Sequence, residues 1–308
     1  MSLRLSIAIP TYRREQVLLD TIRDLLALPD MADEILVVDQ TPQHETATET
    51  TLQHWQATGQ IVWLRLAKPS ITHAMNQALL RAQGDVVLFV DDDIRPSLAL
   101  VTAHKVAYQN PAVQVVAGQA IQPWQQPLPP RFPPQGEYLI DLESDPDKFP
   151  FNGGDPGWVR RFIGCNVSMR RDFALRLGGF DENFVQVAYR FEAEFASRVL
   201  ALGERIWFEP TASLYHLKAE RGGTRQFGEH LTTARPAHTV GKYYYWLQAR
   251  GLTGRGLKIL AAPWRALLTR HHLRQPWWIP VSLWAELVGL TWALWLWAQG
   301  PRLLRERP

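Results

Sequence analysis

The first hundred residues alternate between two hydrophobic patterns, and this alternation restricts the fold more than any other feature. Short apolar runs with the length of buried strands occupy residues 3–9, 34–39, 61–66 and 85–90. Stretches with the apolar spacing of amphipathic helices follow them at residues 14–28, 45–56, 70–83 and 97–109. Strands alternating with such helices predict an α/β fold with right-handed crossovers and a mostly parallel sheet, whose ligand lies at the carboxyl ends of the strands.

Composition excludes several other classes of protein. The 20% of charged and 11% of aromatic residues exclude a mostly disordered chain. A single cysteine, Cys165, excludes an internal disulfide framework and a cysteine-rich zinc site. The length of 308 residues fits two domains, or one large α/β domain with additions. Residues 121–150 contain eight of the 22 prolines and are expected to be irregular, and alternation resumes over 162–216.

Three consecutive carboxylates, Asp91, Asp92 and Asp93, directly follow the apolar run Val86–Val90. Like charges repel, and a divalent cation such as Mg²⁺ or Mn²⁺ prefers such oxygen ligands. Strand alternation turns Asp91 and Asp93 the same way and Asp92 elsewhere. The alternative is a solvated strand end near the start of the next helix.

Polar residues also follow the first two predicted strands. Pro10, Thr11, Tyr12 and Arg14 come after the first, and Asp39 ends the second. Tyr12 could pack against a nucleotide base and Asp39 could accept a hydrogen bond from a base or ribose, although an ordinary turn is the alternative for 10–14. The chain has no G-x-G-x-x-G after the first strand and no G-x-x-x-x-G-K-[ST], which argues against dinucleotide and Walker-type sites.

An ordered set of segments resembles the family 2 glycosyltransferases, which have a GT-A fold. The segments are SIAIPTYRRE, EILVVDQT, SITHAMNQALLRAQGD, VVLFVDDD, FIGCNVSMRRDFALRLGGFDENF and FEAEFASRVLALGERIWFEPTASLYH, within residues 3–225. The resemblance implies a metal and donor diphosphate at Asp91 and Asp93, with His216 completing the metal site or contacting the diphosphate. A hydrogen-bonded core histidine is the alternative for His216. It implies nucleotide contacts from Pro10, Thr11, Tyr12 and Asp39. Asn76 matches a family position that implies a contact to the donor phosphate or sugar, whereas Met75 replaces the usual arginine there.

The same resemblance assigns Glu192 to the position of the catalytic base, with Phe191 replacing the usual preceding glutamate. Helical spacing independently places Glu192 on an apolar face with Phe195 and Val199, where burial would raise its pKa toward that of a useful base. Glu194 lies one turn before Arg198 and is predicted to form an exposed ion pair.

Four further residues are candidates for contacts to the sugar, the acceptor or the diphosphate. Gly164 and Asn166 are expected to face the donor sugar, because small residues allow close backbone approach. Asp181 could contact sugar hydroxyls, although the preceding Gly178 and Gly179 are typical of a helix end and turn. Arg225, after Gly222 and Gly223, could close over a pyrophosphate, and a solvated basic turn is the alternative.

The C-terminal region differs from the rest of the chain. Residues 250–308 carry nine Lys and Arg against two Glu, and contain seven of the 13 Trp. This composition predicts an affinity for anionic lipid rather than nucleic acid. The apolar stretch 275–301 is long enough to cross a bilayer, but Glu286 near its centre, Pro280 and basic residues on both flanks argue against a simple span. Ser282, Glu286, Gly289 and Ala293 form one stripe, so an in-plane or re-entrant helix, a span and a helix covering the core all stay open.

These observations and the resemblance together predict a metal-dependent glycosyltransferase that moves a sugar from a nucleoside diphosphate donor to a hydroxyl of a glycan or lipid-linked acceptor. The resemblance implies that the transfer inverts the configuration of the sugar. The expected cofactor is Mg²⁺ or Mn²⁺, and the expected location is the cytoplasmic face of a membrane, in polysaccharide or glycolipid synthesis. We expect a catalytic domain over 1–225, with a nucleotide and metal half (1–118) and an acceptor half (119–225), and a helical tail over 226–308. The alternatives are a nucleotidyltransferase and a non-catalytic scaffold that binds nucleotide sugars.

Overall fold

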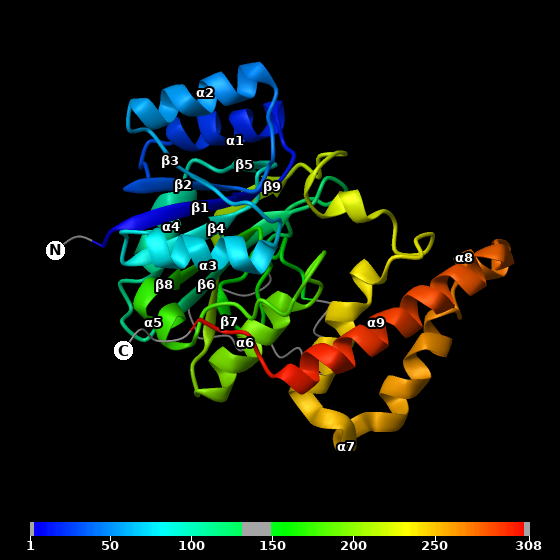
Figure 1. Ribbon diagram of the computed structural model, residues 1–308. Coiled ribbons are helices and arrows are strands. Elements are labelled where there is room, and N and C mark those ends of the chain that lie inside the picture. Colours follow the sequence, from blue (N-terminus) through cyan, green and yellow to red (C-terminus); the bar gives the residue numbers. More distant parts are fainter. Residues whose placement is uncertain (1–2, 131–148, 305–308) are drawn as a thin grey trace.

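A computed structural model describes residues 3–130 and 149–304 of the protein, and the side chains of these residues except those of 250–258. The Pro-rich stretch predicted to be irregular lies partly outside the described residues. Figure 1 shows an α/β body from which a pair of long helices projects.

The first half of the chain forms the alternating elements that the hydrophobic pattern predicts, with ends that differ by a few residues. The strands are β1 (Leu5–Thr11), β2 (Glu34–Asp39), β3 (Val62–Arg65) and β4 (Val86–Val90). The helices are α1 (Gln16–Leu26), α2 (Thr46–Ala57), α3 (Ile71–Arg81) and α4 (Leu100–Ala107). A three-residue strand, β5 (Ile94–Pro96), was not predicted, because it is too short to carry a period and pairs only with the distant β9.

The second half adds strands of mixed direction and two helices. These elements are β6 (Val115–Ile121), β7 (Gly157–Val159), β8 (Asn166–Arg170), α5 (Arg171–Arg176), α6 (Phe191–Ala201) and β9 (Ile206–His216). The C-terminal region contains the short 3-10 helices η2 (Gly223–Phe227), η3 (Pro236–His238) and η4 (Pro276–Trp278), and the helices α7 (Val240–Ala266), α8 (Arg270–Arg274) and α9 (Ile279–Gln299).

One sheet organises the body, in the order β3-β2-β1-β4-β8-β6-β9-β5 with β7 paired to β9. Strands β1 to β4, β6 and β9 run in the same direction, and β8, β5 and β7 run opposite to them. The sheet is therefore mostly parallel, as predicted. The carboxyl ends of β1, β4 and β9 lie at one edge, so Thr11, Asp91 and His216 come together there.

Helices cover both faces of the sheet and bury two hydrophobic cores. Helices α1, α2 and α4 pack on one face, with Leu18, Leu52 and Val101 among the buried side chains. Helices α3, α5 and α6 pack on the other, where Phe180 stacks on Phe195 with ring centroids 4.6 Å apart. Both faces of the strands are buried, which explains why the strand sequences read as continuous apolar runs rather than alternating ones.

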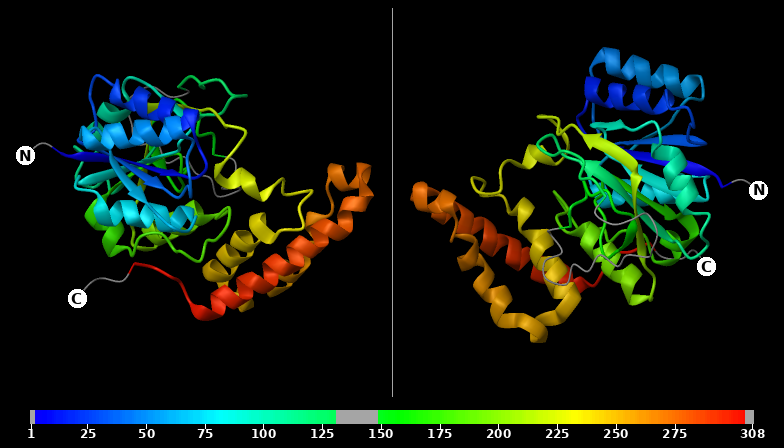
Figure 2. Two further views of the ribbon diagram at one scale, coloured as in Figure 1. Left: turned by 45° about the horizontal axis from the view of Figure 1, so that its top comes forward. Right: turned by 180° about the vertical axis from the view of Figure 1, so that it is seen from behind.

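Helices α7 and α9 pack against each other as a hairpin that projects from the body, with α8 at its far end (Figure 2). The predicted stripe of α9 is the packing face: Ser282, Glu286, Gly289 and Ala293 are all buried. Residues 276–299 are long and apolar enough to cross a membrane by length and composition, and part of this stretch is buried inside the protein. The stripe thus serves helix packing, one of the roles that the sequence left open.

The chain after α9 returns to the body and binds to the turn after α5. The Arg302 backbone N–H donates to Asp181 Oδ1 over 2.9 Å, and the Leu304 N–H donates to the Gly178 carbonyl over 2.8 Å. Asp181 Oδ2 accepts from the Tyr244 hydroxyl of α7 over 2.7 Å. This buried carboxylate therefore joins α7 and the C-terminal segment to the body.

We expect Asp181→Ala to lower the free energy of unfolding by roughly 3 kcal/mol, because it leaves a buried hydroxyl and backbone N–H groups without their acceptor. Urea or thermal unfolding measures the change. Asp172→Ala, at a side chain that is 82% exposed, is the matched control and should be close to neutral. Equal stability of the two variants, with activity lost only in Asp181→Ala, would instead support a sugar contact at Asp181.

Candidate functional site

The three carboxylates after β4 divide between two directions, as strand alternation predicts. Asp91 Oδ2 and Asp93 Oδ1 both approach His216 Nε2, at 3.4 and 3.2 Å. Asp92 turns away and accepts from the Thr11 hydroxyl over 2.6 Å. The predicted pairing of Asp91 with Asp93 is therefore present in the structure.

Arg14 compensates much of the negative charge of this cluster. Its Nε lies 3.1 Å from Asp92 Oδ1 and its Nη2 lies 3.4 Å from Asp93 Oδ2. The Ala219 backbone N–H adds a 2.7 Å hydrogen bond to Asp93 Oδ2. Asp91 has no contact with this arginine among the described contacts, and it is the most exposed of the three carboxylates.

The pKa values of the cluster follow from burial and from these contacts. Burial raises the pKa of Asp91 to about 6 and that of Asp92 to about 7, against the opposing charges of His216 and Arg14. Burial acts in the same direction on Asp93, but His216 and Arg14 hold its pKa below the ordinary value. Burial favours neutral His216, yet the two carboxylates raise its pKa. Bringing the carboxylates together is therefore costly, and a cation at Asp91 would reduce that cost.

The chemistry of the donor groups fits a hard divalent cation. One oxygen of Asp91, the Cys165 sulfur and one ring nitrogen of His216 lie within 4.8 Å of one another. Nδ1 of His216 lies 3.1 Å from Gln122 Oε1, so an imidazole that donates there presents Nε2 to the carboxylates. The Cys165 sulfur is a soft ligand, whereas Mg²⁺ and Mn²⁺ prefer carboxylate oxygen, so Cys165 is a poor ligand for these cations. Asp91, Asp93 and His216 are thus the residues that fit Mg²⁺ or Mn²⁺.

A pocket opens beside this cluster at the carboxyl edge of the sheet. Its lining brings together the predicted residues Pro10, Thr11, Tyr12, Arg14, Asp91, Asp92, Asp93, His216 and Arg225. Gln40, directly after β2, also lines it and had not been singled out in the sequence. The named residues come from four segments far apart in the chain, residues 10–14, 40, 91–93 and 216–225, as expected for a ligand site at a sheet edge.

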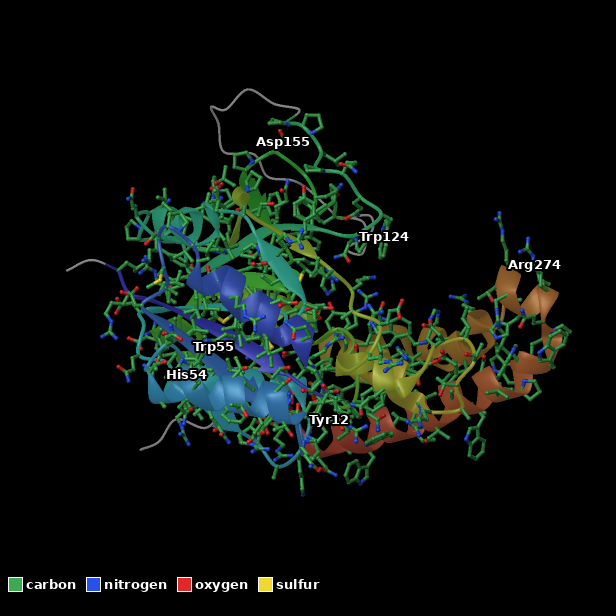
Figure 3. All side chains as sticks on the ribbon, turned by 90° about the horizontal axis from the view of Figure 1, so that it is seen from above. Tyr12, His54, Trp55, Trp124, Asp155 and Arg274 are labelled. Atoms are coloured by element: carbon green, nitrogen blue, oxygen red, sulfur yellow. The ribbon has the colours of Figure 1, made fainter. Side chains whose placement is uncertain are left out.

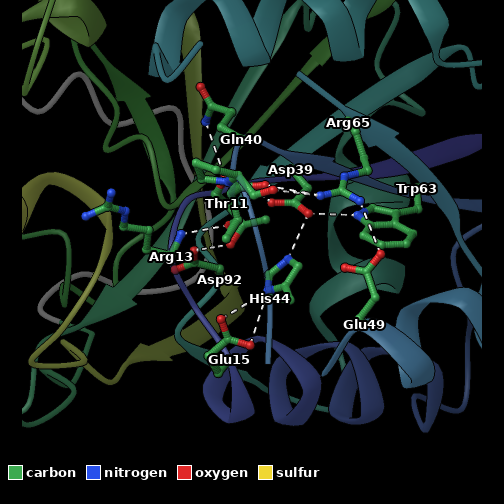
Figure 4. Close-up of polar contacts among 12 residues, drawn as sticks. Thr11, Arg13, Glu15, Asp39, Gln40, His44, Glu49, Trp63, Arg65 and Asp92 are labelled. Carbon is green, nitrogen blue, oxygen red and sulfur yellow. Dashed lines mark hydrogen bonds and ion pairs between the residues drawn. The ribbon is translucent and has the colours of Figure 1, made fainter. Parts of the chain in front are cut away.

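Asp39 ends β2 close to this pocket but does not line it. Its Oδ2 accepts from His44 Nε2 over 2.8 Å and from the Trp63 indole N–H over 2.9 Å (Figure 4). Its Oδ1 accepts from the Thr41 backbone N–H over 2.8 Å. Burial acts to raise the pKa of Asp39, but the hydrogen bonds from His44 and Thr41 hold it below its ordinary value. The nucleotide contact predicted for Asp39 is therefore not visible in this arrangement and stays a prediction.

The loop after β9 is fixed to the start of the chain rather than free. The Gly223 N–H donates to the Tyr12 carbonyl over 2.8 Å. Gly222 has φ +79°, and a Cβ there would lie 2.3 Å from the Arg13 carbonyl oxygen, so only glycine fits. The Nη1 of Arg14 also donates to the carbonyls of Ala219 and Arg221. These contacts hold Arg225, on η2, at the pocket.

Glu192 lies in the first turn of α6 and lines a second pocket with Phe149, Phe151, Phe162, Ile163 and Tyr189. Burial, followed by the charge of Asp91, raises its pKa to about 7. A Cβ at Gly164 would lie 3.3 Å from Glu192 Oε1, so this glycine lets the backbone approach the carboxylate. The sequence prediction of a carboxylate with a raised pKa at the start of this helix agrees with these contacts.

The segment before α6 connects the two pockets through strained backbone. Gln186, Ala188 and Arg190 have φ values of +63°, +51° and +79°, which side chains other than glycine rarely adopt. Gln186 lines the first pocket, and Ala188 and Arg190 line the second. Strain that persists at a site indicates that the surrounding structure maintains it for positioning.

Three predicted ligand residues instead have structural contacts. The Asn76 amide bonds the backbone N–H and carbonyl of Phe180, and Asn76 is fully buried. The Asn166 amide donates to the carbonyls of Gln119 and Ala212 and bonds His104. The Asp181 carboxylate accepts from the Tyr244 hydroxyl and the Arg302 backbone N–H. The family position of Asn76, the small-residue segment of Asn166 and the residue type of Asp181 suggested contacts to the donor or sugar, but none of the three lines either pocket.

Glu194 corrects a prediction. It pairs with Arg198 as expected, at 2.6 Å, but it is buried rather than exposed. Arg198 also donates to the carbonyls of Leu177 and Gly179, which places the pair beneath the turn after α5.

Lys218 lines the first pocket and was missed in the sequence, because no motif marks it. Its Nζ lies 4.0 Å from the centroid of the Trp124 ring, and its backbone has φ +56°. Burial and the charge of Arg225 lower its pKa. Lys218 and Arg225 are therefore two cations that line one pocket. Lys218 and Trp124 are 94 residues apart, so the sequence does not indicate their contact.

Comparison with known proteins identifies the family. The model of glycosyl transferase family 2 matches residues 6–176, which is more than half of the chain. The chain belongs to glycosyl transferase family 2. The matched region contains β1 to β4, the carboxylate cluster and Cys165, and the family confirms the resemblance carried by the sequence segments.

Two relatives carry the same type of name. A Bacillus subtilis (strain 168) protein named uncharacterized glycosyltransferase YfnE is 30% identical over 118 residues, covering 38% of this chain and 30% of that protein. A Haloferax volcanii protein named glucosyl-dolichyl phosphate glucuronosyltransferase is 27% identical over 152 residues, covering 47% of each chain. The chain thus matches less than half the length of each relative.

Solved structures show the GT-A fold that was predicted. GalNAc-T7 with UDP, GalNAc and Mn²⁺ has a TM-score of 0.58 at 14% identity, over 70% of this chain and 44% of that chain. The mannosyltransferase PcManGT of Pyrobaculum calidifontis with GDP-Man and Mn²⁺ has a TM-score of 0.53 at 17% identity, over 97% of this chain and 80% of that chain.

We expect Lys218→Met to weaken binding of a nucleoside diphosphate about tenfold or more, since it removes a cation that can donate to phosphate. Isothermal titration calorimetry measures the dissociation constant. Arg205→Met is the matched control, because Arg205 also stacks on a tryptophan, 4.2 Å from the Trp158 ring centroid, and lines neither pocket. Equal affinities of wild type and Lys218→Met would contradict the role of this lysine.

Proposed function

We propose that this family member is a metal-dependent inverting glycosyltransferase that transfers a sugar from a nucleoside diphosphate donor to an acceptor hydroxyl. One observation carries the proposal: the pocket at the carboxylate cluster and the pocket at Glu192 are neighbours. Gly164 touches Glu192, and the adjoining Cys165 lies within 4.8 Å of Asp91 and His216. A cation site and a basic carboxylate thus flank one position where a reacting carbon can lie.

The first pocket is proposed to bind the donor. Tyr12 offers a ring to the base, and Thr11 and Pro10 line the same pocket. Lys218 and Arg225 supply positive charge for the diphosphate. A divalent cation held by Asp91, Asp93 and His216 would neutralise the charge that develops on the leaving diphosphate. The solved neighbours with UDP or GDP-Man and Mn²⁺ support this assignment through the shared fold.

Glu192 is proposed to remove the proton of the acceptor hydroxyl. A carboxylate with a pKa of about 7 is a stronger base than an ordinary glutamate, and at neutral pH a large fraction of it is still ionised. Attack from the side of Glu192, opposite to the diphosphate, inverts the configuration at the sugar carbon, as the family resemblance implies. Phe149, Phe151 and Phe162 line the same pocket and offer apolar surface to the acceptor.

The C-terminal hairpin is proposed to bring the enzyme to the cytoplasmic face of a membrane, where a lipid-linked or glycan acceptor is glycosylated. The basic, Trp-rich composition supports this location. The name of the Haloferax volcanii relative, which refers to a dolichyl phosphate acceptor, is consistent with it. We retain 1–225 as the catalytic domain, with nucleotide and acceptor halves, and 226–308 as the membrane-associating tail.

Glu192→Gln should lower kcat by a factor on the order of 10² to 10⁴ while donor affinity stays close to that of wild type. The kcat/KM of wild type should rise with pH and level off above about 7, because only the ionised carboxylate accepts a proton. Turnover at several pH values with the matching nucleotide sugar measures both effects.

Product analysis completes this experiment. Release of a nucleoside diphosphate is the expected result, whereas release of pyrophosphate would support the nucleotidyltransferase alternative. Full activity of Glu192→Gln would refute the base assignment. Binding of donor and metal by wild type without turnover of acceptor or water would favour a scaffold.

A further inference from the structure

We propose that the α7–α9 hairpin (residues 240–299) docks along the surface of an anionic bilayer and that α9 does not cross it. This inference rests on the proposed membrane location and specifies how the membrane is bound. Composition alone leaves a span, an in-plane helix and a soluble helix possible, and the packing of the hairpin distinguishes among them.

The inner face of α9 packs against α7 and the residue before it. Both carboxylate oxygens of Glu286 lie 2.8 Å from Lys242 Nζ, and Glu286 also accepts from the Tyr243 hydroxyl. Thr239 Oγ1, just before α7, donates to the Ala285 carbonyl over 2.9 Å. A Cβ at Gly289 would lie 2.0 Å from the same Thr239 oxygen, so the glycine permits this close approach. Glu286, whose charge would make a single membrane-spanning helix costly, is therefore paired and hydrogen-bonded inside the hairpin.

Helix α7 is a poor partner for a membrane crossing. Its 27 residues include five basic ones, at 242, 250, 255, 258 and 265. Because α9 packs along α7, inserting α9 across the hydrocarbon would bring these charges with it or break the Lys242–Glu286 pair. The folded hairpin therefore opposes a span.

Both ends of the hairpin are also fixed to the body. Gly241, in the first turn of α7, abuts Tyr189, since a Cβ there would lie 2.3 Å from the Tyr189 carbonyl oxygen. The Gly300 carbonyl after α9 accepts from Asn183 Nδ2 over 2.8 Å, and Arg302 binds Asp181. A crossing would carry the turn that contains α8 to the other side, and this turn holds Arg270, His271 and Arg274. Arg274 lies at the far end of the hairpin in Figure 3.

The outward surface of the hairpin has the chemistry of a membrane interface. Of the 19 exposed large hydrophobic side chains among the described residues, eight lie between 260 and 295. These eight are Leu260, Trp264, Leu268, Leu273, Trp277, Trp284, Leu287 and Trp295. Exposed tryptophan is typical of the headgroup region of a bilayer.

The positive charge of the hairpin surface favours an anionic bilayer, rather than a second copy of the chain, as its binding partner. Arg265, Arg270 and Arg274 are exposed next to the apolar side chains. Among the described residues from 250 to 304 the only acidic one is Glu286, which is buried and paired. Two such surfaces would repel each other, whereas anionic lipid complements them.

This docking would place the acceptor pocket near the lipid. Tyr189, which lines the Glu192 pocket and is 44% exposed, borders the start of α7. Figure 1 shows the hairpin leaving the body on the side to which the parallel strands point. An acceptor held in the bilayer would then approach Glu192 without leaving the interface.

Flotation of the purified full chain with vesicles tests the docking. Binding is expected to phosphatidylcholine vesicles that contain phosphatidylglycerol, not to phosphatidylcholine alone, and to weaken with salt. The triple variant Arg265→Gln, Arg270→Gln and Arg274→Gln should lower partitioning on the order of a hundredfold. Trp284→Ser with Trp295→Ser should also lower it. Met31→Ser with Leu98→Ser, at exposed apolar positions of the body, is the matched control and should bind like wild type.

Cysteine labelling in the vesicle-bound state tests the topology. Gln275→Cys at the tip should react without detergent with a membrane-impermeant maleimide added outside sealed vesicles, more slowly than Leu98→Cys on the body because the tip lies at the interface; native Cys165 is buried and does not interfere. Carbonate at pH 11 should release the protein from membranes of the expression host.

A tip cysteine that reacts only after detergent, with protein retained in carbonate, would overturn the inference in favour of a span. Failure to bind anionic vesicles would overturn it as well, and a dimer broken by the Trp284 and Trp295 changes would identify a second copy as the occupant. Donor binding by each variant, measured in the absence of vesicles, reports the proposed activity separately.

Discussion

The repulsion among Asp91, Asp92 and Asp93 is the constraint on which the rest of the site depends. A buried apolar strand delivers three carboxylates to one edge of the sheet, where desolvation favours their neutral forms. Thr11 and Arg14 stabilise Asp92, and Arg14, His216 and the Ala219 N–H stabilise Asp93. Asp91 receives least, with His216 as its one described charged contact. The negative charge of Asp91 is therefore the least compensated of the three, and a cation bound at Asp91 would give the largest stabilisation.

The same compensation organises the surrounding loops. Arg14 binds the carbonyls of Ala219 and Arg221 as well as two carboxylates, so the charge of the cluster fixes the loop that carries Lys218 and Arg225. On the other side, Gly164 and Cys165 connect the cluster to Glu192, whose pKa reflects the charge of Asp91. The carboxylate cluster, the two cations of the first pocket and Glu192 are therefore electrostatically connected, and a change in one is expected to affect the others.

The helices and strands of the body were predictable from the sequence, whereas the hydrogen-bond partners of individual buried polar side chains were not. Short apolar runs located the four strands and a period of 3.6 residues located the four helices of the first half, and strand alternation separated Asp92 from its neighbours. The long-range pairing of β5 with β9 was not predicted, because a strand of three residues is too short to show a hydrophobic period. Asn76, Asn166 and Asp181 have the residue types of sugar ligands, but the structure directs them to backbone groups and Tyr244. The position of Lys218 at the pocket could not be predicted, because it depends on the contact with Trp124, which lies far away in the sequence and close in the fold.

The most direct measurement is the thermal unfolding midpoint with Mn²⁺ and a panel of nucleoside diphosphates, for wild type and Asp91→Asn. We expect one nucleotide together with Mn²⁺ to raise the midpoint of wild type, because a ligand stabilises only the folded state, and we expect Asp91→Asn to lose most of this increase. Asp172→Asn, exposed on the body, should behave as wild type. Equal increases in wild type and Asp91→Asn, or increases that do not depend on Mn²⁺, would contradict a cation at Asp91 that holds the donor diphosphate.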